Sequence, residues 1–414
     1  MSSVCVHGLG YIGLPTAAML SNYDFDVIGY DASPEVVERL SQGQVDFEEP
    51  ELRAFVERSL ASGDLTVSAE AVPADYHIIC VPTPLTDEMS ADLEYVRAAG
   101  RSVAEELRQG DTVILESTVP PGTTVEVLRP ILEESGLTVG ETFSLAHCPE
   151  TVLPGNIVQE LKTNDRVIGS ANGGEPTSAV RLYESFVEGE IHTTDATTAE
   201  FVKLMQNTFR DVNIAFANEV ARRCYQVGID SRETIELANT HPRVDVLQPG
   251  PGVGGHCLPI DPYFLADSSE VDTDSLVLLA REVNDSMRTH VTDLLEDALG
   301  DVDGRSVAVL GVAYKGNVGD IRESPGLALA DHLTSNGVDV TLTDAHVDDE
   351  HLRLEPFEEA VAGADAAVIV TDHDEYVELT PSDLDSLGNP VVVDTKGVLD
   401  RERFRRAGFE VYRV

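Results

Sequence analysis

The sequence predicts an α/β protein in which two doubly wound parallel-sheet domains are joined by a helical central domain. Three observations lead to this fold class. A short apolar strand pattern at residues 3–7 runs into a glycine-rich turn and then a helical pattern, the same plan of strands returns at residue 306, and the residues between read mainly as long helices. We expect three domains, at residues 1–190, 191–300 and 301–414, with the linker to the last domain near residues 300–304.

The first strand pattern leads into the sequence GLGYIG at residues 8–13. In a strand, turn and helix context, G-x-G-x-x-G indicates dinucleotide binding in a Rossmann-like domain, because the glycines let the backbone approach a pyrophosphate at the helix N-terminus. The next strand pattern, residues 27–31, ends in an aspartate placed to bond a ribose hydroxyl, which favours NAD. The candidate cofactor-binding residues here are Gly8, Gly10, Tyr11, Ile12, Gly13 and Asp31.

Three further strand patterns end in residues suited to a ligand site. Residues 77–81 end in Pro82-Thr83-Pro84, residues 111–116 end in a polar segment that includes Thr118, and residues 143–148 lead to Glu150. In a parallel sheet the carboxyl ends of strands open on the cofactor crevice. Polar strand ends are also common as plain turns, and a loop glutamate is most often solvated, so each alone favours a structural role.

Residues 196–227 read as one long helix. Its apolar set is Phe201, Leu204, Met205, Phe209, Val212, Ala215 and Phe216. Lys203, Asn207 and Arg210 follow at i, i+4 and i+7, so they share a face. A second long helix is predicted at about 273–299. A helical middle of this size could provide a dimer interface.

Between these helices, residues 250–261 contain four glycines and two prolines, with Cys257 followed four positions later by Asp261. A segment this rich in glycine fits neither a helix nor a strand interior, and it lets backbone approach a ligand. A thiol there can be a nucleophile or a buried thiol in a tight turn. The other four cysteines lie in apolar patterns and read as small core residues; they are Cys5, Cys80, Cys148 and Cys224.

The last part of the chain repeats the strand plan of the first. The patterns at 306–311, 338–344, 366–371 and 391–395 correspond in order to the strands at 3–8, 27–31, 78–83 and 113–118. This predicts a second, shorter Rossmann-like domain. Its first turn lacks G-x-G-x-x-G and reads GVAYKGN at 311–317, so we expect a different nucleotide there.

Composition limits the possible partners. The 414 residues include 74 acidic and 28 basic ones, giving a formal charge of −46. Such a surface repels itself in dilute buffer and is screened by concentrated salt, so we expect a halophilic, cytoplasmic protein whose activity falls at low ionic strength; a basic partner is the alternative. We expect no nucleic-acid partner without a basic patch, no membrane partner without a long apolar run or signal sequence, and no metal without cysteine ligand spacing.

Motifs from end to end resemble the UDP-glucose/GDP-mannose dehydrogenase superfamily. They are GLGYIG, VPTP, STVPPGTT, the helix AEFVKLMQNTFRDVNIAFANE, HPRVDVLQPGPGVGGHCLPIDPYF and GVAYKGNVGDIRESP. The segments PETVLPG, HPRV and LQPGPGVGGHC are most similar to the branch that acts on UDP-N-acetyl-D-mannosamine. The resemblance implies two Rossmann-like domains around a helical dimerisation domain, NAD as cofactor, a UDP-sugar substrate and a homodimer.

The resemblance also implies a reaction, the four-electron oxidation of a sugar C6 alcohol to a carboxylate. Cys257 matches the nucleophile that captures the aldehyde and becomes a thioester, which suits thiolate chemistry. Lys203 and Asn207 match the pair that stabilises an oxyanion, and Asp261 with Lys203 matches the group that transfers protons. Glu150 matches a carboxylate that assists thioester hydrolysis, and Thr118 a hydroxyl beside the reacting centre and the nicotinamide.

Binding roles follow from the same resemblance. Tyr314 and Lys315 match positions that hold the nucleotide sugar, Arg322 one that reaches the cofactor, and Arg243 one supplied by the other subunit. If Arg243 acts across the interface, a monomer would be inactive. The further cofactor-binding candidates are Pro82, Thr83 and Thr118, and the further substrate-binding candidates are Leu153, Lys203, Asn207, Arg210 and Gly254.

One departure concerns the sugar. The acetamido-sugar branch commonly reads P-E-R where this chain has Pro149-Glu150-Thr151. The alternatives are therefore a UDP-glucose or a UDP-N-acetylglucosamine 6-dehydrogenase. A two-electron 3-hydroxyacid dehydrogenase would leave the thiol and the second nucleotide domain unexplained, and a dinucleotide-binding sensor would have little need for Cys257, Lys203 and Asp261 together.

Overall fold

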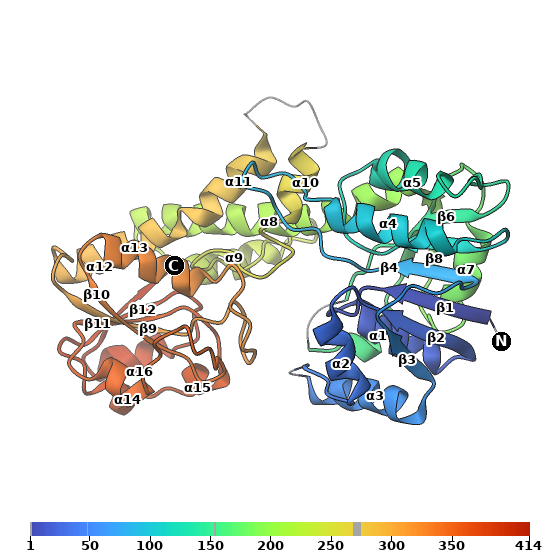
Figure 1. Ribbon diagram of the computed structural model, residues 1–414. Coiled ribbons are helices and arrows are strands. Elements are labelled where there is room, and N and C mark those ends of the chain that lie inside the picture. Colours follow the sequence, from blue (N-terminus) through green and yellow to red (C-terminus); the bar gives the residue numbers. More distant parts are fainter. Residues whose placement is uncertain (1, 48, 153–154, 268–274) are drawn as a thin grey trace. The chain divides into compact units, whose positions relative to one another are not determined.

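The computed structural model describes residues 2–47, 49–152, 155–267 and 275–414 (Figure 1). They form two compact units, one reaching from the N-terminus to Gln206 and the other containing Asn207–Ala266 and the C-terminal part of the chain. The boundary falls within helix α8, Ala196–Val227. The three-domain division stays a prediction. Among the described residues, no helix combines the length and apolar character that crossing a membrane would need.

The N-terminal unit is built on an eight-stranded sheet in the order β3-β2-β1-β4-β5-β6-β7-β8. Neighbouring strands are parallel except β6 and β7, which run antiparallel. The strands predicted at 3–7, 27–31, 77–81, 111–116 and 143–148 are confirmed, whereas β3, β7 and β8 were not predicted. The strands are β1 Ser2–His7, β2 Phe25–Tyr30, β3 Leu65–Ser68, β4 Tyr76–Ile79, β5 Thr112–Leu115, β6 Ser144–His147, β7 Arg166–Ser170 and β8 Ile191–Asp195.

Both faces of the sheet are buried at its central strands β4 and β5, which is why every residue of these two strands is buried without alternation. Val4, Ile78 and Ile114 point to one face and pack in one core cluster. Val113 and Leu115 point to the other face and pack with residues of α4 and η1. The helices of this unit before α8 are α1 Gly13–Ser21, α2 Pro34–Ser41, α3 Pro50–Ser62, α4 Glu94–Glu106, the π-helix η1 Thr123–Leu128, α5 Arg129–Glu133, α6 Ile157–Thr163 and α7 Thr177–Tyr183.

Helix α8 has the predicted bounds, but much of its apolar set is exposed. Leu204 and Ala215 are buried, whereas the side chains of Phe201, Met205, Phe209 and Phe216 are about half exposed or more. The apolar pattern therefore marks two faces of the helix, one in the core and one at the surface of this chain.

The second predicted helix is wrong as a single element. Within the described residues it consists of α11 Leu276–Asp285 and α12 Met287–Leu299, and residues 273 and 274 lie outside the described part. The break falls at Ser286, whose hydroxyl donates to the carbonyl of Val283 and accepts from Arg222. A serine that bonds its own backbone competes with the helical ladder. The other helices of this region are α9 Ser231–Asn239 and α10 Asp261–Asp267.

The C-terminal sheet has five parallel strands in the order β10-β9-β11-β12-β13. This order repeats the β2-β1-β4-β5 order of the first sheet, so the predicted repeat of the strand plan is confirmed. The strands are β9 Ser306–Leu310, β10 Asp339–Thr343, β11 Ala366–Ile369, β12 Val391–Asp394 and β13 Glu410–Arg413. The helices are α13 Pro325–Ser335, α14 Phe357–Val361, α15 Asp374–Val377, the short 3-10 helix η2 Pro381–Leu384 and α16 Arg401–Arg406.

Candidate functional site

The three glycines of the first turn have different local environments. Gly8 has φ +95°, and a Cβ on it would lie 2.5 Å from the carbonyl oxygen of Cys80. A Cβ on Gly13, the first residue of α1, would lie 1.9 Å from the carbonyl oxygen of Gly8. Around Gly10 nothing lies within 4 Å of the Cβ position. Gly8 and Gly13 therefore make the tight turn, and Gly10 leaves open space for a ligand to approach the backbone.

Asp31, directly after β2, completes this turn. Its carboxylate accepts a hydrogen bond from the backbone N–H of Leu9 at 2.9 Å and another from Ser33 at 2.8 Å. The hydroxyl of Tyr11 donates to Glu49. An open glycine at the start of a helix, with a fixed carboxylate at the end of the neighbouring strand, fits the pyrophosphate and ribose of NAD.

The ends of β4 and β5 lie side by side, as predicted. The hydroxyl of Thr83 donates to the carbonyl of Thr118 at 2.7 Å. Beyond Thr118 the loop is held by Glu200 of α8, whose carboxylate accepts from the N–H groups of Gly122 and Thr124 and from the Thr124 hydroxyl. Burial raises the pKa of Glu200 to about 7, although these hydrogen bonds act in the opposite direction. Sequence reasoning missed Glu200.

Glu150 is fixed by a buried arginine that sequence reasoning also missed. Its Oε2 accepts from Nη1 of Arg166 at 2.6 Å, and its Oε1 accepts from the backbone N–H groups of Thr151 and Val152. Glu150 is 7% exposed and Arg166, the first residue of β7, is 1% exposed. Burial alone would lower the pKa of Arg166, but Glu150, Cys148 and Glu116 together outweigh burial and raise that pKa. Glu150 is therefore not a solvent-exposed loop residue, which was the alternative interpretation of its sequence position.

A second buried acid lies near the same arginine. Glu116, directly after β5, is 2% exposed and accepts a hydrogen bond from the hydroxyl of Tyr183 and one from the thiol of Cys80. Burial and the charge of Glu150 raise the pKa of Glu116, while Arg166 lowers it. One guanidinium therefore serves two buried carboxyl groups.

Lys203 lines a cavity of about 200 Å³ in the N-terminal unit. Pro149 and Thr151, on either side of Glu150, line the same cavity, together with Asp165 and His192. The predicted site residue Lys203 is thus brought beside the predicted Glu150 segment. Leu153 lies outside the described residues.

In the second unit, Asn207, Asp261 and Cys257 form one connected group. The Asn207 amide donates to Asp261 Oδ2 at 2.6 Å, and both side chains are buried. The backbone N–H of Asp261 donates to the carbonyl of Cys257 at 2.9 Å, so the thiol stands just before the turn that starts α10. Cys257 is half-buried, and its loop contains no helix or strand, as predicted.

The Cys257 loop packs against the segment after β9. A Cβ on Gly254 would lie 2.6 Å from the carbonyl oxygen of Glu323 and 2.7 Å from Cβ of Tyr314, so only glycine fits. Hydrogen bonds to Asp320 chiefly raise the pKa of Arg322, and the charge of Cys257 adds to the rise. Arg322 therefore lies within electrostatic reach of the thiol, where a positive charge stabilises a thiolate.

Three predicted substrate-binding residues are surface side chains of this chain. Lys315, Arg210 and Arg243 are exposed, and Arg243 donates a weak backbone hydrogen bond to His241. Their roles in binding stay predictions.

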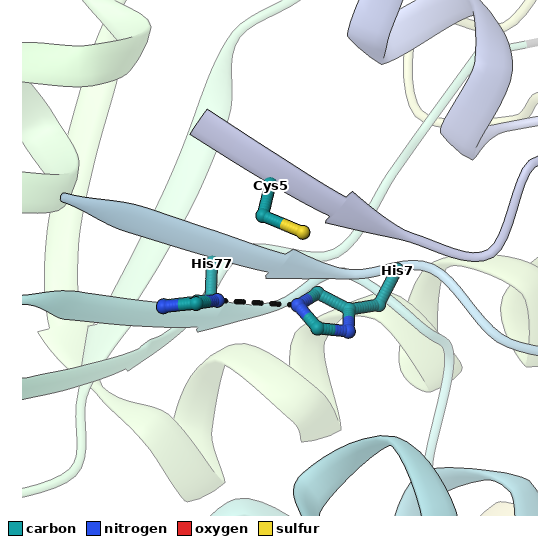
Figure 2. A group of neighbouring side chains, drawn as sticks. All are labelled: Cys5, His7 and His77. Atoms are coloured by element: carbon teal, nitrogen blue, oxygen red, sulfur yellow. Dashed lines mark hydrogen bonds between the residues drawn. The ribbon is translucent and has the colours of Figure 1, made fainter. Parts of the chain in front are cut away.

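The cysteines outside the loop behave largely as predicted. Cys5, Cys148 and Cys224 are buried, and Cys80 is half-buried. Figure 2 shows Cys5 and His7 on β1 and His77 on β4, with the sulfur directed toward the imidazoles. His7 Nε2 and His77 Nδ1 lie 3.2 Å apart, and burial lowers the two pKa values to about 3 and about 4, so both rings are neutral. The absence of a metal stays a prediction.

Three models of one protein family match successive parts of the chain. The NAD binding domain of the UDP-glucose/GDP-mannose dehydrogenase family matches residues 2–187, its central domain residues 197–286, and its UDP binding domain residues 308–401. Together with the open dinucleotide turn and the thiol-bearing loop, they define an NAD-dependent dehydrogenase of nucleotide sugars.

Known proteins resemble the chain over nearly its full length. It is 44% identical to UDP-N-acetyl-D-mannosamine dehydrogenase of Methanocaldococcus jannaschii, covering 99% of this chain and 95% of that protein. It is 40% identical to NDP-N-acetyl-D-galactosaminuronic acid dehydrogenase of Ralstonia nicotianae, covering 97% of each. The structure of UDP-D-ManNAc dehydrogenase from Pyrococcus horikoshii matches with a TM-score of 0.92 and 42% identity, covering 100% of this chain and 99% of that one. The chain belongs to the UDP-glucose/GDP-mannose dehydrogenase family.

Proposed function

We propose that the protein oxidises the C6 alcohol of a UDP-N-acetylhexosamine, with UDP-N-acetyl-D-mannosamine as the first choice, to the uronate. The observation that carries the proposal is the group of Cys257, Asp261 and Asn207, a half-buried thiol on a glycine loop joined to a buried carboxylate and amide. The overall change converts an alcohol, two NAD⁺ and water into a carboxylate, two NADH and three protons.

Cys257 has the chemistry of the nucleophile. Its thiolate adds to the C6 aldehyde and forms a carbon–sulfur bond, giving a thiohemiacetal that the second oxidation converts into a thioester. The nearby charge of Arg322 supports the thiolate. The turn at Gly10, with the carboxylate of Asp31, would hold NAD, which would supply the hydride acceptor for both oxidations.

Oxyanion stabilisation and proton transfer are assigned to Asn207, Lys203 and Asp261. The Asn207 amide is fixed by its 2.6 Å bond to Asp261, so its geometry is set before substrate arrives. Fixed donors of this kind stabilise an oxyanion because they need no reorganisation during the reaction. Lys203 supplies the positive charge for the same oxygen, and Asp261 takes up protons released from it.

Glu150 is the carboxylate we assign to hydrolysis of the thioester. Arg166 and two backbone N–H groups hold it in one orientation. A water activated by it adds to the thioester carbon, and the carbon–sulfur bond breaks to return Cys257 and release the carboxylate product.

We also propose that the active form is a homodimer. Phe209 and Phe216 are 65% and 57% exposed on α8, although large apolar side chains of this kind usually lie in cores or interfaces. Arg243 is exposed and would complete the substrate site of the other subunit. Replacing Phe209 by serine should shift the protein toward monomer in light scattering and reduce activity in proportion; full activity of a monomer would contradict the shared site.

The test counts NADH formed per UDP-N-acetyl-D-mannosamine consumed in high salt. Intact protein is compared with Cys257→Ser and with the matched control Cys224→Ala, which changes a buried thiol of α8 outside the proposed site. We expect two NADH per sugar from the intact protein and the control, and no sustained turnover from Cys257→Ser.

The outcomes separate the chemistry from the sugar. One NADH per sugar with an unaffected Cys257→Ser variant would exclude the thioester route. UDP-glucose and UDP-N-acetylglucosamine, run in parallel, decide which sugar the pocket beside Thr151 accepts. The acetamido-sugar names of the relatives in Methanocaldococcus and Ralstonia support an acetamido sugar.

A further inference from the structure

A second cavity, of about 650 Å³, lies in the C-terminal unit. It is lined by the end of α8, the turn that starts α9, helix α16 and the whole of β13. β13 is the edge strand of the sheet, and all four of its residues line the cavity. A volume of this size is typical of pockets that bind small molecules.

The charge of this cavity is opposite to that of the chain. Arg401, Arg405 and Arg413 line it, against the acids Asp230 and Glu410. The whole chain has only 28 basic residues against 74 acidic ones. A local excess of guanidinium groups in a chain of charge −46 is the reverse of what composition alone would place there.

The acids present pair with two of these arginines. Asp230 is shared between Arg401 at 3.1 Å and Arg413 at 3.6 Å, and its other oxygen caps the N-terminus of α9. Arg413 also lies 3.8 Å from the buried carboxylate of Asp394. Across the described residues, no acid lies within ion-pair distance of Arg405, which is exposed. Burial, and then the charge of Arg405, lower the pKa of Arg401, as expected where guanidinium groups crowd together.

Two aromatic rings belong to the same lining. Tyr225 comes from α8 and Tyr412 from β13. The hydroxyl of Tyr412 donates to Glu410 at 3.2 Å, which engages the second acid of the cavity. Tyrosine rings beside arginines offer a surface for a planar base next to donors for a phosphate.

We propose that this cavity is an anion site that binds a phosphate group, supplied either by inorganic phosphate or by a nucleotide. Arg405 provides a guanidinium that has no acidic partner among the described residues, and Arg401 and Arg413 provide the surrounding positive field. Guanidinium groups suit phosphate because their planar donors match its oxygens.

This site is separate from the predicted substrate position. Tyr314 and Lys315 follow β9, and in the sheet β11 and β12 lie between β9 and β13. A ligand in the cavity would instead join β13 to the α8–α9 turn, where the hydroxyl of Ser231 already donates to the carbonyl of Val414 at 2.9 Å. Binding there should therefore stabilise the C-terminal unit against unfolding.

The test is calorimetric titration of the full chain with inorganic phosphate and, separately, with GMP, whose base is neither that of NAD nor that of a UDP-sugar. Ionic strength is held constant with KCl, because chloride screens such contacts, and NAD is present throughout to fill the dinucleotide turn. The variant is Arg405→Gln. The matched control is Arg403→Gln, which removes the same charge from the same helix but does not line the cavity. Repeating the titrations in Lys315→Gln separates this site from the substrate position.

We expect binding that survives Lys315→Gln, weakens about tenfold or more in Arg405→Gln, the effect of losing one charged donor, and changes less than about twofold in Arg403→Gln. GMP binding more tightly than phosphate would identify a nucleotide as the ligand, and equal affinities would identify inorganic phosphate. The proposal is overturned if neither probe binds the intact protein at millimolar concentration, or if both arginine variants weaken binding equally.

Discussion

The buried pair of Arg166 and Glu150 allows a quantitative prediction. Replacing Arg166 by methionine keeps a side chain of similar length but removes the only guanidinium bonded to Glu150 among the described residues, and it leaves Glu116 without its nearby positive charge. The side chains of the pair are 0% and 6% exposed, so water cannot replace the lost partner. Breaking such a pair by removing one partner costs about 3–5 kcal/mol of unfolding free energy.

A double-mutant cycle tests the cause of this loss. Glu150→Gln removes the charge that Arg166 compensates, so the double variant Arg166→Met with Glu150→Gln should be less destabilised than the sum of the two single variants. We expect a coupling free energy of about 2–3 kcal/mol. The measurement is urea unfolding followed by far-UV circular dichroism in high salt. The exposed Arg181, in α7 of the same unit, is the control, and Arg181→Met should change stability by less than about 0.5 kcal/mol.

A coupling below about 0.5 kcal/mol would refute the reasoning, because the two side chains would then act independently. Arg166→Lys separates charge from shape. If the charge is what matters, lysine should recover a large part of the stability, whereas the guanidinium's second contact, from Nη2 to the carbonyl of Leu161, would remain lost.

Three further predictions have defined outcomes. Gly13→Ala should prevent folding of the N-terminal unit because its Cβ would lie 1.9 Å from a backbone oxygen, whereas Gly10→Ala should fold normally and bind NAD at least about tenfold more weakly in calorimetry. Burial lowers the pKa values of His7 and His77 to about 3 and about 4, so below their unfolded value near 6.5 the unfolded chain binds more protons. Stability should fall by about 1.4 kcal/mol per histidine and pH unit between pH 6.5 and 4.5, and His77→Phe should roughly halve the part of this slope that the pair contributes; an unchanged slope in urea unfolding would exclude the pair as its cause. Activity should fall as KCl is removed, and full activity in dilute buffer would contradict the inference from the charge of −46.

Strands and the long helix were predictable because their signals are local. The predicted strands of both sheets are short apolar runs bounded by glycine, proline or polar residues, and α8 keeps a helical period from Ala196 to Val227. The strands β3, β7, β8 and β13 were missed, and β8, with the sequence IHTTD, has little apolar character. The repeat of the strand plan also lies in the sequence itself, and it anticipated the matching β2-β1-β4-β5 and β10-β9-β11-β12 orders.

Strand direction and helix breaks were harder to predict from the sequence. β6 and β7 run antiparallel, but a strand pattern has the same period in both directions, so the sequence could not reveal it. The break at Ser286 depends on a hydroxyl bonded to Val283 and Arg222, of which the arginine comes from α8. Contacts between distant segments decide such features, and no periodicity reports them.

Some features of the candidate site could be predicted from the sequence, and others could not. The glycines at 8, 10 and 13 were predictable because their spacing encodes a backbone geometry. The pairing of Asn207 with Asp261 joins residues 54 positions apart, and only the family resemblance placed them in one site. Glu200, which holds the loop after Thr118, stands near the start of α8 beside residues that read as an ordinary helix.

The composition of the chain contains one indication of the buried arginine–carboxylate pairs, which was not used when the motifs were interpreted. In a chain with 28 basic and 74 acidic residues, we would expect most of the few arginines to be exposed to solvent. Among the described residues only Arg166 and Arg281 are buried, and each pairs at 2.6 Å with a buried carboxylate, Glu150 and Asp211 respectively. In the sequence, both arginines stand next to apolar residues. Arg166 begins the run Arg166-Val167-Ile168, and Arg281 follows a run of leucines. Because a buried charge needs a partner, an arginine in such a pattern indicates a buried acid elsewhere in the chain, and the scarcity of cations makes that indication stronger here than in an ordinary protein.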